Sequence, residues 1–165
     1  MKSFRQYLLE QNTESPAPYD VSQDLQSIED HTTDNGIRVT THHYVSKKYG
    51  VSRKIHVWTT PEGTIQAYTG WGNIDENGNI EDSSNPQTNI PKGLKVAKSD
   101  MAFRYLADFA RKHPHIEEIL YQTEDTEAGK RSQIRTETYW PHYQKKHNID
   151  TRLVRVSDTW KNPLK

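Results

Sequence analysis

The sequence predicts an α+β domain in which a mixed, mostly antiparallel sheet packs against two main helices. Three closely spaced segments alternate between apolar and polar residues, which is typical of strands in an antiparallel meander. Two amphipathic helical patterns follow, and a short apolar segment comes after each of them. The predicted order after residue 35 is therefore β-β-β-α-β-α-β. Since a helix between two strands favours parallel pairing, the later part of the sheet should contain a right-handed parallel crossover.

The strands of the meander are predicted at residues 37–45, 53–59 and 64–71. Successive side chains of a strand point to opposite faces, so the neighbouring rings of His42 and His43 should point away from each other. Two rings in this arrangement do not easily bind one metal ion together.

A short helix is predicted before the meander, at residues 20–30, because apolar residues recur there at helical spacing after an aspartate suited to the N-cap. After the meander, residues 72–98 are polar and irregular. Asn77-Gly78 within this segment predicts a small hairpin between Ile74 and Ile80. A loop of this length in a compact domain is more often functional or mobile than without a role.

The strongest helical pattern covers residues 99–112, with Ser99 suited to the N-cap and Pro114 ending the pattern. Three further elements are predicted, namely a strand, a second helix and a last strand, at residues 116–123, 132–147 and 151–156. Pro141 lies inside the second helix and should kink or split it.

Composition excludes several classes of function. The chain has 165 residues, which suits one domain, and its 22 basic and 22 acidic side chains give a formal net charge of zero. This balance argues against a histone-like coat for nucleic acid, although a local basic patch is compatible with it. The absence of cysteine excludes disulfides, thiolate metal sites and cysteine nucleophiles. No apolar segment approaches the ~20 residues of a membrane span, so no membrane partner is expected.

Histidines and carboxylates do not form a recognisable metal motif. His142 and His147 are five positions apart, whereas a helical zinc pair uses four. The sequence therefore predicts no metal site.

The first ten residues, MKSFRQYLLE, form a short amphipathic segment, and residues 11–19 form a linker rich in proline and polar residues. The segment resembles the capsid-targeting sequence of T-even bacteriophage internal head proteins, which begins with Met-Lys and ends in a hydrophobic-x-Glu signal. Leu8 and Glu10 match that signal. The resemblance implies that a prohead protease cuts between Glu10 and Gln11. The linker would then remain attached to the single domain expected at residues 20–165. The alternative interpretation is an amphipathic N-terminal helix that packs on this domain.

The same resemblance implies where the protein acts. An internal head protein lies in the virion, travels with the DNA and enters the host cytoplasm. Its partners would be the prohead scaffold and protease, and then a host protein. The expected function is to inhibit or modify a host factor such as a defence nuclease.

The order of the predicted elements over residues 37–156 resembles the GNAT acyltransferase fold. In that family the loop before the central helix binds the coenzyme A pyrophosphate through backbone N–H groups, and a tyrosine of the second helix often acts as general acid. The resemblance implies acetyl-CoA as cofactor and Tyr139 or Tyr143 as the catalytic residue. Residues 91–99, the equivalent of the loop, lack the glycines that the family carries beside the helix.

Two basic segments are predicted to lie at helix N-termini, where phosphates and carboxylates bind. The candidate anion-binding or cofactor-binding residues of the two segments are Lys92, Gly93, Lys95, Lys98 and Ser99, and Lys130, Arg131 and Arg135. Aromatic residues follow the second segment, so a nucleotide or nucleic-acid binding module is a third hypothesis. The alternative interpretation places these aromatic residues in the core and the arginines in solvent.

Overall fold

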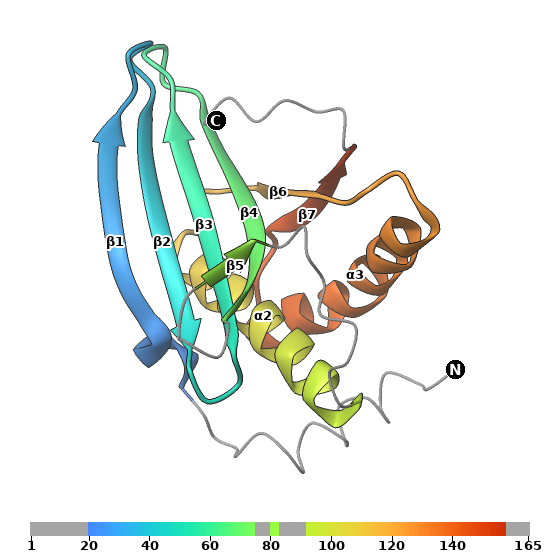
Figure 1. Ribbon diagram of the computed structural model, residues 1–165. Coiled ribbons are helices and arrows are strands. Elements are labelled where there is room, and N and C mark those ends of the chain that lie inside the picture. The colour runs from blue at the N-terminus through green and yellow to red at the C-terminus, as the bar shows by residue number, and fades with distance from the viewer. Residues whose placement is uncertain (1–19, 75–79, 83–91, 158–165) are drawn as a thin grey trace.

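The computed structural model describes residues 20–74, 80–82 and 92–157, which form a mixed seven-stranded sheet with two long helices (Figure 1). This arrangement confirms the predicted α+β class. The strands are β1 (Leu25–Thr32), β2 (Arg38–Ser46), β3 (Val51–Thr59), β4 (Ile65–Ile74), β5 (Ile80–Asp82), β6 (Glu118–Gln122) and β7 (Arg152–Val156). The helices are η1 (Val21–Asp24), α2 (Lys92–Lys112) and α3 (Glu127–His147).

The sheet has an antiparallel part and a parallel part. Strands β1 to β4 pair as an antiparallel meander, and the short β5 pairs with β4 through Ile74 and Ile80, which confirms the predicted hairpin pairing. The turn residues Asn77-Gly78 lie outside the described residues. Strand β6 runs parallel to both β4 and β7, with α2 before it and α3 after it along the chain. The predicted parallel pairing late in the chain is therefore confirmed.

The helix predicted at residues 20–30 is wrong beyond its first turn. Only η1 is helical, and the carboxylate of Asp20 caps it by accepting a hydrogen bond of 3.0 Å from the backbone N–H of Ser22. The chain then continues as β1, with a register irregularity between Leu25 and Ser27. Backbone pairing with β2 outweighs the helical spacing of three apolar residues, because each β1 residue gains contacts across the strands.

Both long helices begin earlier than predicted. Helix α2 begins at Lys92, so Ser99 lies inside the helix and does not cap it. Helix α3 begins at Glu127, and the hydroxyl of Thr126 caps it by accepting from the N–H of Gly129 at 3.1 Å. The predicted split at Pro141 is also wrong, because α3 is one continuous helix. Proline has no N–H to donate to the carbonyl one turn earlier, but Pro141 is exposed, so that carbonyl can bond to water instead.

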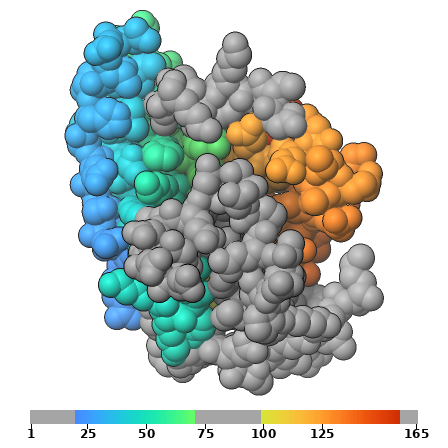
Figure 2. Space-filling model, viewed as in Figure 1, coloured from blue at the N-terminus to red at the C-terminus, as the bar shows by residue number. Residues whose placement is uncertain are grey.

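The core lies between one face of the sheet and the two helices, which Figure 1 shows on the same side of β1–β4. Helix α2 is the central element, since almost every residue from Met101 to Ala110 is buried. The space-filling view shows β1 and β2 as one flank of the molecule and α3 as the other (Figure 2). We call the helix-covered side of the meander its inner face and the opposite side its outer face.

Candidate functional site

The first predicted basic segment lies within α2. Lys92, Gly93, Lys95 and Lys98 belong to its first two turns, and their side chains lie outside the part of the chain that the structure describes. The free N–H groups of this helix therefore belong to its first turn and not to Ser99, which is partly buried. Anion binding by these residues stays a prediction.

The second basic segment lies on the first turns of α3. Lys130, Arg131 and Arg135 are all exposed, and Lys130 lies 3.7 Å from Glu127 in a surface ion pair. Gly129, next to Lys130, is buried and packs closely against the preceding loop: a Cβ at this position would lie 1.7 Å from the carbonyl oxygen of Glu124. The structure thus brings these cations together on the surface at the start of α3.

The loop between β6 and α3 is tied to β7 by Arg155. This guanidinium donates to the hydroxyl of Thr123 at 2.6 Å and pairs with Asp125 at 2.5 Å. The loop lies at the carboxyl ends of two parallel strands, which is a common ligand position. Asp125 neutralises Arg155 there, so this cation holds the loop in place.

The predicted catalytic tyrosines lie on the part of α3 that packs against α2. Tyr143 is 4% exposed, and its hydroxyl donates to the carboxylate of Asp100 at 2.6 Å, while Tyr139 is partly buried against the core. Burial raises the pKa of Asp100, and Arg104, whose Nε lies 2.8 Å from it, opposes that shift. In this position the Tyr143 hydroxyl joins α3 to α2 and lies away from the surface.

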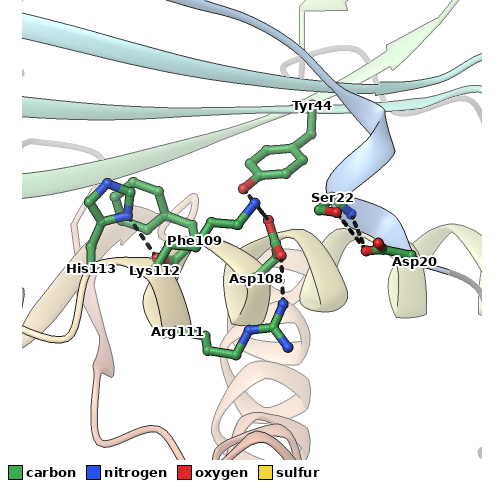
Figure 3. Close-up of polar contacts among 8 residues, drawn as sticks. All are labelled: Asp20, Ser22, Tyr44, Asp108, Phe109, Arg111, Lys112 and His113. Atoms are coloured by element: carbon green, nitrogen blue, oxygen red, sulfur yellow. Dashed lines mark hydrogen bonds and ion pairs between the residues drawn. The ribbon is translucent and has the colours of Figure 1, made fainter.

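A second buried carboxylate, Asp108, forms the centre of a polar cluster at the C-terminal end of α2 (Figure 3). Tyr44 of β2 donates to one carboxylate oxygen at 2.7 Å, and the ammonium of Lys112 lies 2.9 Å from the same oxygen. Arg111 lies 3.2 Å from the other oxygen. Burial and the bond to Asp108 raise the pKa of Tyr44, so the phenol stays protonated. We call these four residues the Asp108 cluster.

His42 lies beside the Asp108 cluster on the inner face of β2. Its ring centroid lies 5.1 Å from that of Phe109 and 5.0 Å from that of His113, whose Nδ1 is 2.9 Å from the Phe109 carbonyl oxygen. Burial, together with the nearby His113 and Lys112, lowers the pKa of His42 to about 4, and burial is the largest of these causes. His42 is therefore a neutral core ring at neutral pH.

This burial predicts acid sensitivity. Because the pKa of His42 is lower in the folded chain than the ordinary ~6.5, the unfolded chain binds more protons, and stability should fall as pH drops from about 6.5 towards 4. We expect a loss of about 2 kcal/mol from this ring, allowing for partial solvent screening. Urea unfolding between pH 7 and 4.5 measures it.

His42→Phe is expected to reduce this pH dependence, since the ring that titrates is gone. His31 is exposed, and the matched His31→Phe change should leave the pH dependence as in the parent chain. Equal slopes for the parent and His42→Phe would contradict the assignment.

His43 and His56 lie on the outer face, which confirms that His42 and His43 point to opposite faces. The Nδ1 of His56 lies 2.8 Å from the hydroxyl of Thr41, and its ring is stacked on Tyr68 at a centroid distance of 6.3 Å. Burial is the main cause that lowers the pKa of both histidines, and Lys54 adds to it. Sequence alternation places each ring on a face but does not show that three strands bring these side chains together.

No group of three or more histidine or acidic side chains is arranged to bind a metal ion within residues 20–74, 80–82 and 92–157. Neither α2 nor α3, the long helices of the described chain, is apolar enough to cross a membrane. Comparison with protein-family models, curated proteins and solved structures finds no match to this chain.

Proposed function

We propose that this chain is an internal head protein of a T-even-type bacteriophage, packaged with the DNA and injected into the host. One observation carries the proposal: the chain begins MKSFRQYLLE, which ends in a hydrophobic-x-Glu signal, and a proline-rich linker follows. A linker at the cut site gives a protease access to an extended backbone.

The described fold is compatible with removal of the first ten residues. Its first described residue is Asp20, which caps η1, and its core cluster runs from Val21 to Ile149, with Leu153 packed against it. A cut after Glu10 would therefore keep every residue of that cluster. We propose that the remaining domain inhibits or modifies a host factor, such as a defence nuclease, after injection.

The N-terminus of the protein in purified virions tests this proposal. We expect mass spectrometry to find a chain that begins at Gln11, and Glu10→Ala to abolish the cut because the protease loses its signal residue. Glu14→Ala, a matched change in the linker, should leave the cut intact. Virions that contain only the full-length chain, or none, would refute the proposal.

A second candidate function is acyl transfer of the GNAT type, and the path of the chain favours it. Strand β4 pairs in parallel with β6 over residues 67–69 only, and then pairs with β5. The central helix α2 comes between β4 and β6 in the chain, as the GNAT resemblance requires.

The residues present do not fit the coenzyme A site that the resemblance implies. The chain lacks the paired glycines before α2, and the Tyr143 hydroxyl is bonded to Asp100 in the core. Calorimetric titration of the protein with acetyl-CoA tests the acyl-transfer candidate. If no heat of binding is detected, acyl transfer of the GNAT type is refuted.

A further inference from the structure

The outer face of β1–β4 carries neither α2 nor α3, because both pack on the inner face (Figure 1). The strand register arranges the outer side chains in rows that cross the strands. Two adjacent rows contain Ser27, His43, Lys54 and Gly70, and Glu29, Thr41, His56 and Tyr68. Titratable and aromatic side chains from four strands thus share one surface.

Gly70, on β4, leaves open space at one end of its row. A Cβ at this position would meet no atom within 4 Å, and Gly70 is not among the residues with positive φ. Neither backbone strain nor a neighbouring atom therefore requires glycine here. A glycine inside a strand often marks a place where a ligand approaches the backbone.

Aromatic rings border the open space on one side. Tyr68 lies two residues from Gly70 on the same face, and the planes of its ring and of His56 are inclined by 20°. The contact between the Nδ1 of His56 and the hydroxyl of Thr41 orients the His56 ring. Two nearly parallel rings beside an open position form a platform for a further planar group.

A cation borders the same space on another side. Lys54 is directly opposite Gly70 in the register, and its side chain is exposed. Within the described part of the chain, Lys54 forms no ion pair. Among the described side chains of β1–β4, the other charged or titratable groups of this face are Glu29, His31 and His43.

We propose that this surface, the Gly70 site, binds single-stranded nucleic acid. A base would lie over Gly70 beside the His56–Tyr68 pair, and a phosphate would pair with Lys54. Aromatic rings on an open sheet face stack unpaired bases, and a neighbouring cation follows the backbone. Four strands span about 14 Å, which suits two or three nucleotides. This inference is independent of the packaging proposal.

Fluorescence anisotropy of a labelled oligothymidylate, titrated with the full chain at low salt, tests the inference. We expect binding that Lys54→Glu and Gly70→Leu each weaken about tenfold, the first by removing a phosphate contact and the second by filling the base position. Lys145→Glu makes the same charge change on an exposed side chain of α3 and should alter affinity about twofold at most.

Four results would overturn the inference. These are no binding by the parent chain, equal affinity for a duplex of the same sequence, equal affinity for an acidic peptide, or parent-like binding by Lys54→Glu. If the double variant Arg131→Glu, Arg135→Glu loses binding while the Gly70-site variants keep it, the nucleic acid binds at the start of α3 instead. If circular dichroism shows that Gly70→Leu does not fold, the affinity of Lys54→Glu still tests the inference. Because the side chain of Lys54 is exposed, its replacement should not disturb the fold.

Discussion

Gly129→Ala should destabilise the protein strongly, although alanine is normally the better helix residue. In an open helix this change adds about 1 kcal/mol of stability. Here the new Cβ would lie 1.7 Å from the carbonyl oxygen of Glu124, and 2.7 Å from its carbonyl carbon. Backbone atoms must then move apart, so we expect a loss of about 3 kcal/mol and a fall in Tm of about 10 °C.

The matched control is Gly70→Ala. The same methyl group is added there to a position with nothing within 4 Å, so stability should change by less than about 1 kcal/mol. Thermal unfolding followed by circular dichroism measures both variants. If Gly129→Ala were as stable as the parent, the loop before α3 would not be packed on the helix.

Asp108→Ala should lower the stability of the protein by a similar amount, because it removes hydrogen bonds and ion pairs and not because it creates a steric clash. The Tyr44 hydroxyl would lose its acceptor in a buried position, and Lys112 and Arg111 would lose their carboxylate. A buried donor left without a partner costs about 1 to 3 kcal/mol, and bonds to charged groups are worth more than neutral ones. We therefore expect urea unfolding to show a loss of about 3 kcal/mol.

One further variant tests the hydrogen bond within the Asp108 cluster, and one surface variant serves as its control. Tyr44→Phe removes the donor, so its effect and that of Asp108→Ala should not add when the two changes are combined. Asp30→Ala removes an exposed carboxylate that pairs with Arg38 and should change stability far less. Strict additivity at Tyr44 and Asp108 would show that their hydrogen bond contributes nothing to the fold.

Part of the candidate site could be predicted from the sequence. An aspartate followed by cations three and four positions later predicts the helix pairs of Asp108 with Arg111 and Lys112. Its partner Tyr44 could not be predicted, because 64 positions separate the two residues along the chain. The Gly70 site was missed for the same reason, since its side chains come from different strands.

The sequence by itself determined β2, β3 and β4 of the meander, the hairpin pairing of Ile74 with Ile80, and the ends of both long helices at Lys112 and His147. These features depend on the alternation of apolar and polar residues along a strand and on residues that end a helix, and both signals act within a few positions of the chain. Only the tertiary structure decided that residues 25–32 form a strand, that α2 and α3 begin early, and that Tyr143 is enclosed. The strand at residues 25–32 and the enclosure of Tyr143 depend on partners distant in the chain, whose contact energy exceeds the small differences in local preference. The early start of α3 depends on nearer contacts, namely the Thr126 cap and the packing of Gly129 on Glu124.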